Sequence, residues 1–174
     1  CVADIASGDI VIASMLFMEE QIRPVLAALA ARREHCDAMV CCMSAGEISR
    51  LTRMGRFDMS KSDSSFMTLL KRLRPKREAR QSAGAQQMAM LRRLPQLLRF
   101  IPGTAQDVRV YFMVLQCWLA GSHVNIASMV QLLVKRYASG PREPLRRLAD
   151  PPPPVEYPEV GLYHPRVAER FFDT

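Results

Sequence analysis

The chain has 174 residues, of which 49% are hydrophobic and 24% charged, and its formal net charge is +7. This composition is typical of a globular, soluble protein with one modest domain or parts of two. No basic segment followed by an apolar one lies near the start, so the sequence gives no support for a signal peptide. Because the chain begins at Cys1, inside a strand-like pattern, and ends on RFFDT, we expect it to be a piece of a longer polypeptide.

The first part of the chain predicts a strand, a helix and a second strand. Asp9–Phe17 is a β-branched apolar run of strand length. Apolar residues then recur at helical spacing through Ile22–Arg32, and Pro24 requires this helix to begin near residues 20–21. Ala38–Met43 is a second buried strand. Tight connections between these elements predict a right-handed βαβ unit with two parallel strands, which places the chain in the α/β class as a Rossmann-like remnant.

A short helix is predicted after the second strand. Ser44 and Glu47 have the spacing of a capping box, in which each side chain bonds a free backbone N–H group of the first turn. The helix is expected to continue through Met54 and to end at Gly55.

Most of the net charge lies in one window. Between Lys71 and Arg99 nine basic residues accompany a single acid, Glu78. Such a run could meet nucleic acid, an anionic membrane surface or an acidic partner. The window contains no aromatic residue for base stacking, so we expect no nucleic-acid partner. Because the stretch Lys71–Arg80 has little apolar surface, we expect it to be exposed and poorly ordered.

Two helices joined by a short turn are predicted next. Thr104 and Asp107 have capping-box spacing, and Gly121 is a natural stop for the first helix. Its polar residues leave an apolar run far shorter than the ~18 residues of a membrane span, so we expect a buried helix of a soluble protein. Ser122 is predicted to cap the second helix, which ends before Gly140. The face expected to be buried on this second helix consists of Val124, Ala127, Val130, Leu133, Val134 and Tyr137.

The last part of the chain predicts a spacer followed by a new element. Asp150–Pro158 contains five prolines and reads as a stiff, extended tract. Val160–Pro165 is predicted to be a short strand that runs into a proline turn. We therefore expect three parts. They are the C-terminal part of an α/β domain (1–58), a basic linker with a mostly helical hairpin region (59–149), and a spacer leading into the first strand of a further α/β domain (150–174).

Few residues show a catalytic or metal-binding pattern. The SAGE segment lacks the spacing of a dinucleotide-binding loop. The sequence also shows no pattern of serine, histidine and acid that would indicate a catalytic triad. His35 and His123 are predicted to lie on the surface. His164 ends a predicted strand, where ligands of α/β sheets bind, so it is a candidate ligand-binding residue, with a structural turn as the alternative. The five cysteines lack zinc-site spacing and are expected to be reduced thiols: Cys1, Cys36, Cys41, Cys42 and Cys117.

Four segments follow one another along nearly the whole chain. They are IVIASMLFMEEQI, DAMVCCMSAGEISRLTRMGRFDMS, LRRLPQLLRFIPGTAQDVRVYFMVLQCWLAGSHVNI and VGLYHP. In this order they resemble the large H subunit of magnesium chelatase, of the bacterial type, with AQDVRVYFMVLQCWLAGS as the most specific part. The turn at His123 differs from the proline-containing or acidic turn of that family. This difference affects the resemblance only in this loop. The family's subunit is many times longer, so the resemblance implies a fragment from its N-terminal portion.

The resemblance implies that the whole subunit binds protoporphyrin IX and provides the surface on which Mg²⁺ is inserted. An ATPase subunit of the AAA+ type and its companion subunit would supply ATP hydrolysis, in cytoplasmic (bacterio)chlorophyll biosynthesis. The porphyrin-binding and metal-delivery residues are expected outside this fragment, so we assign it no catalytic residue, no metal ligand and no bound cofactor, and expect it to be inactive alone. The part after the spacer would begin the chelatase body.

Two alternatives stay open at this point. One is a fragment of a cobaltochelatase large subunit of cobalamin biosynthesis, which shares the chelatase body. The other is an interaction module that performs no chemistry. We expect no transmembrane segment, and peripheral association with a membrane stays open.

Overall fold

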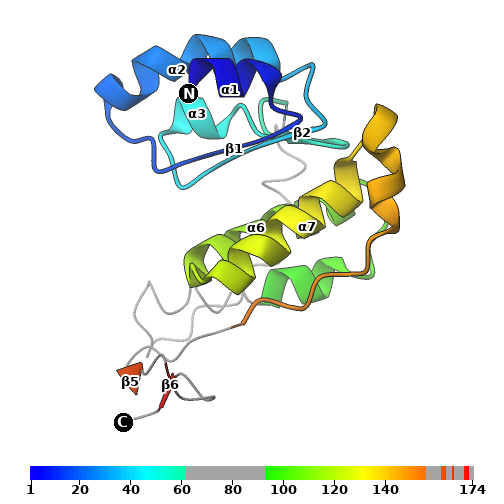
Figure 1. Ribbon diagram of the computed structural model, residues 1–174. Helices are drawn as coiled ribbons and strands as arrows, with labels where there is room; N and C mark the ends of the chain where they lie inside the picture. Colours follow the sequence, from blue (N-terminus) through cyan, green and yellow to red (C-terminus); the bar gives the residue numbers. More distant parts are fainter. Residues whose placement is uncertain (62–92, 156–161, 164–165, 167–170, 173–174) are drawn as a thin grey trace, which may run out of the picture.

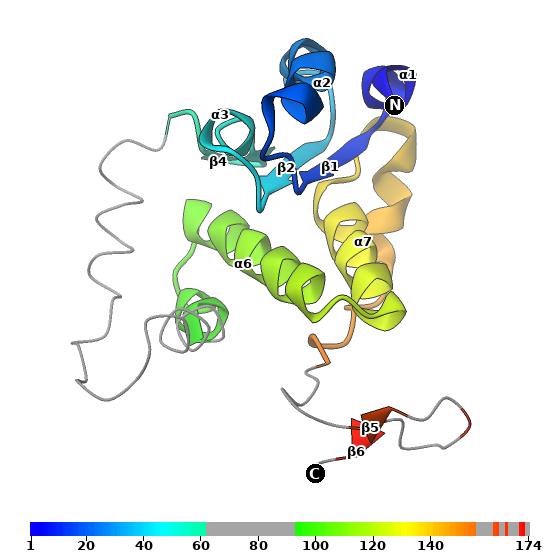
Figure 2. The same cartoon turned by 90° about the vertical axis from the view of Figure 1, so that its left-hand side faces the viewer.

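The computed structural model describes residues 1–61, 93–155, 162–163, 166 and 171–172. Two expectations lie outside the described residues: the exposure of Lys71–Arg80 and the position of His164. The described part contains a four-stranded mixed sheet with helices on both of its faces (Figures 1 and 2). The α/β class expected from the sequence is confirmed at this level.

The elements before residue 62 are α1 (Val2–Ser7), β1 (Ile10–Ser14), α2 (Glu19–Arg32), β2 (Ala38–Cys42), α3 (Gly46–Ser49), β3 (Arg53–Met54) and β4 (Phe57–Asp58). After residue 92 they are a helical segment at residues 93–98, α6 (Thr104–Ala120), α7 (His123–Tyr137), the 3₁₀ helix η1 (Gly140–Arg147), β5 (Leu162–Tyr163) and β6 (Phe171–Phe172). Helices α2 and α3 cover one face of the sheet, with α1 packed on α2, and α6 and α7 lie on the other face (Figure 2).

The two predicted parallel strands are confirmed. β1 and β2 pair in parallel from Ile10↔Ala38 to Ser14↔Cys42, and α2 connects them. All five residues of β2 are buried, as expected of a strand with helices on both faces. Helix α2 begins at Glu19, so Pro24 lies in its second turn, close to the predicted start. The local hydrophobic pattern was therefore sufficient to predict this unit.

The short helix predicted after the second strand is present as α3, but its predicted cap at Ser44 and its extension to Met54 are wrong. Helix α3 has only four residues, and the Ser44 hydroxyl accepts a hydrogen bond from Leu16 N (3.1 Å) and donates to Cys42 O (3.0 Å) instead of capping it. Strands β3 and β4 follow as an antiparallel hairpin that adds to the free edge of β2. Pairing there buries Met54 and Phe57 completely or nearly so, which a short exposed helix would not achieve.

Arginine side chains anchor this hairpin to the end of α2. Arg33 is buried, forms ion pairs with Glu34 and Asp58, and donates from Nε to Leu51 O (3.1 Å). Arg53 on β3 donates from Nε to the backbone oxygen of Arg33 (2.9 Å). The buried guanidinium therefore has partners on both sides, as a charge removed from water requires.

Both ends of the chain differ in detail from the sequence expectation. The strand-like pattern at Cys1 is wrong, because Val2–Ser7 is helix α1. A strand was predicted within Val160–Pro165, and β5 lies there. β5 pairs antiparallel with β6, so the chain returns as a second strand at Phe171–Phe172.

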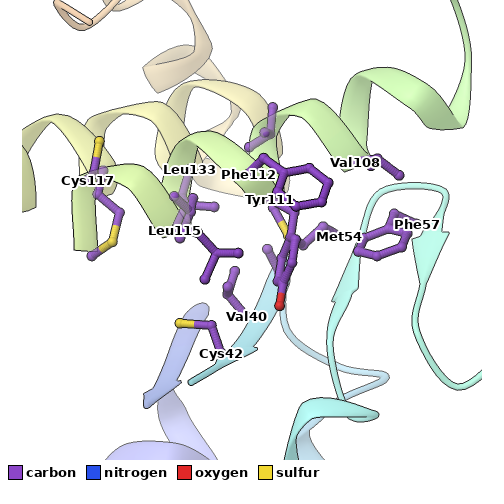
Figure 3. Close-up of a cluster of buried hydrophobic side chains, with 14 of the residues drawn as sticks. Val40, Cys42, Met54, Phe57, Val108, Tyr111, Phe112, Leu115, Cys117 and Leu133 are labelled. Atoms are coloured by element: carbon purple, nitrogen blue, oxygen red, sulfur yellow. The ribbon is translucent and has the colours of Figure 1, made fainter. Parts of the chain in front are cut away.

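A single apolar cluster joins the sheet to the helical layer (Figure 3). Val40 and Cys42 from β2 and Phe57 from β4 meet residues of α6 that recur at helical spacing, among them Tyr111 and Leu115. The rings of Phe57 and Tyr111 pack with their centroids 5.6 Å apart in a tilted arrangement. The helical hairpin is therefore packed directly on the α/β sheet.

The α6–α7 hairpin is confirmed, and its turn residues act as predicted. Gly121 ends α6 in the left-handed conformation (φ 66°), and the Ser122 hydroxyl accepts a hydrogen bond from Asn125 N (3.2 Å) at the start of α7. The capping box predicted for Thr104 and Asp107 is wrong, because Gly103 is the N-cap residue and makes no side-chain cap. Among the helices that the structure describes, none has the length and apolar character needed to cross a membrane.

The buried face predicted for α7 is only partly right. Leu133 and Tyr137 are buried as expected, whereas Val124 and Val130 are exposed. The helix is rotated so that a different set of residues faces the core: Asn125, Ser128, Met129, Leu133 and Tyr137. Asn125 and Ser128 are polar, so a search for apolar residues at helical spacing predicted the neighbouring face instead.

Candidate functional site

Asp107 lies at the junction of the sheet and both long helices. Its side chain is 6% exposed, with Oδ2 accepting a hydrogen bond from Arg56 N (2.9 Å) in the β3–β4 turn and Oδ1 accepting one from Tyr137 Oη (3.0 Å) on α7. Arg136 Nε lies 3.8 Å from Oδ1. Burial, together with the negative charge of Asp107, raises the pKa of Tyr137, so the phenol stays protonated and donates. The arrangement stabilises a junction between three elements.

A second polar cluster joins η1 to the start of both parallel strands. Asp37, before β2, accepts hydrogen bonds from Ser139 N (3.0 Å) and from the Ser139 hydroxyl. Arg142 Nη2 lies 2.9 Å from Asp9 Oδ1 and 3.4 Å from Asp37 Oδ2. Burial opposes ionisation of Asp37, but the Ser139 hydrogen bonds and the Arg142 charge hold its pKa below the usual value. Asp37 is thus an ionised partner in these structural contacts.

The carboxyl edge of the parallel strands is the place where an α/β sheet most often binds a ligand. β1 and β2 end side by side, and the next residues, Met15 and Met43, both have left-handed φ angles of 62° and 46°. Met15 N donates to Met43 O (3.0 Å), and Ala45 N donates to Leu16 O (2.8 Å). A left-handed methionine costs roughly 1–2 kcal/mol, which these hydrogen bonds between the two loops help to offset.

Four large apolar side chains are exposed at this edge. Met15, Phe17, Met18 and Met43 are between 42% and 64% exposed. Thioethers and a phenyl ring adapt to apolar surfaces but transfer no protons. The sequence analysis missed this edge as a surface, because it placed Met15, Phe17 and Met43 within the predicted strands. The edge can contact an apolar ligand or protein surface.

The histidines do not form a site in the described part of the chain. His35 and His123 are exposed, as predicted, at a turn and at the first residue of α7. The candidate His164 lies outside the described residues and stays a prediction. Within the described ranges, no group of three or more His, Cys, Asp and Glu residues is arranged to hold a metal ion.

The thiols of the described residues are free, and all but Cys1 are buried. Burial raises the pKa of Cys41 to about 12 and that of Cys42 to about 11, with the neighbouring thiols adding to the rise at Cys41. The expectation of reduced, buried thiols therefore holds for four of the five cysteines: Cys36, Cys41, Cys42 and Cys117.

We expect these four thiols to resist alkylation in the folded chain. At pH 8 the thiolate fraction of Cys41 and Cys42 is on the order of 1 in 10³ or less, and the reagent lacks access as well. A time course with N-ethylmaleimide, read peptide by peptide by mass spectrometry, should show fast modification of Cys1 and modification of the others only in denaturant. Rapid labelling of Cys41 or Cys42 in native buffer would contradict the packing described above.

Comparison with known proteins adds two findings. Residues 1–112 match the family model described as a domain of unknown function, DUF3479. The chain is 47% identical over 166 residues to the H subunit of magnesium chelatase from Cereibacter sphaeroides and 45% identical over 168 residues to that from Rhodobacter capsulatus. These alignments cover 95% and 97% of this chain and 14% of each relative.

A more distant relative shows the same pattern. The chloroplastic ChlH subunit of magnesium chelatase from Oryza sativa subsp. indica is 31% identical over 176 residues, covering 99% of this chain and 12% of that subunit. The chain therefore spans about one seventh of the length of the two bacterial relatives.

Proposed function

The chain belongs to the DUF3479 family and, through similarity along nearly its whole length, to the H subunits of magnesium chelatase, and from this premise we propose that it forms part of a subunit that inserts Mg²⁺ into protoporphyrin IX. The observation that carries the proposal is that the similarity extends across the sheet, the helical hairpin and the tract after it. In this proposal Mg²⁺ and the porphyrin are substrates of the whole subunit, in (bacterio)chlorophyll biosynthesis and photosynthesis.

The proposal includes the partners expected for such a subunit. A AAA+ ATPase subunit and its companion would couple ATP hydrolysis to metal insertion, in the cytoplasm of a bacterium. Peripheral contact with a membrane is compatible with the apolar carboxyl edge of the sheet, where Met15, Phe17 and Met18 are exposed. The names of the relatives support a magnesium chelatase over the cobaltochelatase alternative.

Within the subunit, we assign this region a supporting role. Its described acids Asp37, Asp58 and Asp107 are engaged by arginine or by backbone and hydroxyl donors, and burial keeps its inner thiols protonated. Residues 1–58 are proposed to be the end of a Rossmann-like domain, 59–149 a linker and hairpin region, and 150–174 the start of the chelatase body. His164 is the proposed ligand-contacting residue of that last part.

The test is metal insertion by the full-length subunit. Protoporphyrin IX, Mg²⁺, ATP and both partner subunits should yield the fluorescence of Mg-protoporphyrin, and omission of ATP or of either partner should abolish it. A parallel reaction supplies Co²⁺ and a corrin ring. Insertion of cobalt without insertion of magnesium would identify the subunit as part of a cobaltochelatase. If neither metal is inserted, the result would favour the interaction module.

A further inference from the structure

Helix α7 carries a second apolar face that the described residues leave uncovered. Besides the face packed on α6, it presents Ala127, Val130 and Val134, at positions i, i+3 and i+7 on its other side. A helix that is apolar on both sides is the pattern of a helix enclosed by protein on both sides. The sequence analysis placed Ala127, Val130 and Val134 in the buried face of α7, although the core of this chain packs on the opposite side.

This face forms the floor of a groove of about 820 Å³, which we call the α7 groove. Its lining consists of Gly121, His123, Ile126, Ala127, Val130, Gln131, Val134 and Leu148. Val130 is 46% exposed and Leu148 is 41% exposed, at positions where apolar side chains gain about 25 cal/mol for each Å² removed from water. Because the lining is mostly apolar, with His123 and Gln131 as its polar side chains, it suits apolar side chains of another protein segment better than a small polar ligand.

The tract after η1 passes the groove at Leu148 and continues along α7 to Val155. Lys135 Nζ donates to Leu148 O (2.8 Å) and pairs with Asp150, and Gln131 Nε2 donates to Ala149 O (3.0 Å). At the other end, Asn125 Nδ2 donates to Val155 O (2.9 Å), and Asn125 Oδ1 accepts from Val155 N (2.8 Å). These contacts hold residues 148–155 along α7, with Leu148 in the groove lining and Val155 at Asn125, on the face packed on α6.

We propose that the α7 groove is the docking surface for the part of the same polypeptide that lies outside these 174 residues and follows residues 148–155. The proposal rests on the proposed function in one respect: the matched H subunits are about seven times longer than this chain. A segment tethered to the same chain, which passes the groove at Leu148, has an effective concentration in the millimolar range, which favours it over a separate molecule. The apolar stripe of α7 is then an internal contact between two parts of one subunit.

The first test measures access to the groove in the full-length subunit. Val130→Cys places a thiol in the groove, and Val124→Cys is the matched control on the same helix, 39% exposed and outside the groove lining. Both substitutions are close in volume, so the fold is retained. We expect maleimide to label Val130→Cys at least about tenfold more slowly in the native subunit than in denaturant, while Val124→Cys stays reactive. Labelling of Val130→Cys at its denatured rate would overturn the proposal.

The second test identifies the occupant. p-Benzoylphenylalanine replaces Ala127 in the groove lining, and a mixture of ¹⁴N- and ¹⁵N-labelled full-length subunit is irradiated in the presence of both partner subunits. We expect cross-linked peptides of a single isotope that join α7 to a segment outside the 174 residues. Mixed-isotope products would assign the groove to a second copy, and products with a partner subunit would assign it to that partner. Either result overturns the proposal.

The outcome is independent of catalysis. A subunit that inserts no Mg²⁺ but gives the internal cross-link would overturn the proposed function and support the docking. A subunit that inserts Mg²⁺ but has a freely reactive Val130→Cys thiol would support the proposed function and overturn the docking.

Discussion

Replacement of Gly55 by alanine should lower the free energy of unfolding by about 3 kcal/mol, one of the largest effects expected from adding a single methyl group to this chain. Gly55 has a φ angle of 56°, which costs an alanine roughly 1–2 kcal/mol. A Cβ at this position would also lie 2.8 Å from Asp107 Oδ2 and 3.0 Å from Oδ1. The carboxylate would have to move, which breaks its hydrogen bonds to Arg56 N and Tyr137 Oη at a cost of roughly 1–3 kcal/mol.

Two other glycines separate these contributions. Gly140 has the same φ of 56°, and no atom lies within 4 Å of the place that an added Cβ would take, so Gly140→Ala measures the backbone contribution alone. Gly46 has neither a positive φ nor a close neighbour, and Gly46→Ala should be nearly neutral. For a chain of this size a loss of 3 kcal/mol corresponds to a fall in Tm of about 6–12 °C, measurable by circular dichroism. Equal losses for Gly55→Ala and Gly140→Ala would show that the contact with Asp107 contributes nothing.

The same junction shows where sequence reasoning succeeded and where it failed. Long, strongly patterned segments such as β1, α2 and β2 were predicted because their burial repeats along many residues. Strands β3 and β4 have two residues each, too few to establish a period, and they form because β2 offers a free edge. Asp107 was interpreted as a capping residue from its spacing to Thr104, although it lies among apolar neighbours at a buried position of α6.

The prediction of the buried face of α7 was wrong for a different reason. Its sequence contains two candidate faces, and local periodicity cannot tell which of them the rest of the chain will cover. The face packed on α6 includes Asn125 and Ser128, and the Asn125 side chain is satisfied by a tertiary partner, the backbone of Val155. Burial of this polar residue depends on a partner 30 positions away, which no local pattern contains.

The isolated 174-residue chain should have no chelatase activity, whereas the full-length subunit should have it. The assay places the two side by side with ATP, Mg²⁺, protoporphyrin IX and both partner subunits, and follows the fluorescence of Mg-protoporphyrin. A porphyrin titration of each protein accompanies it, since we expect the macrocycle to bind the subunit and not the isolated chain. Circular dichroism and the slow labelling of Cys41 and Cys42 serve as the control that the isolated chain is folded.

The reason lies in what insertion demands of a protein. The site must enclose a macrocycle, remove water from Mg²⁺, which prefers a near-octahedral set of oxygen ligands, and accept two pyrrole protons. In the described part, the apolar α7 groove is open to solvent, and the carboxylates of Asp37, Asp58 and Asp107 are held in structural contacts with other elements. A folded isolated chain that produced Mg-protoporphyrin at a measurable rate would place the active site within these residues and contradict the supporting role assigned to them.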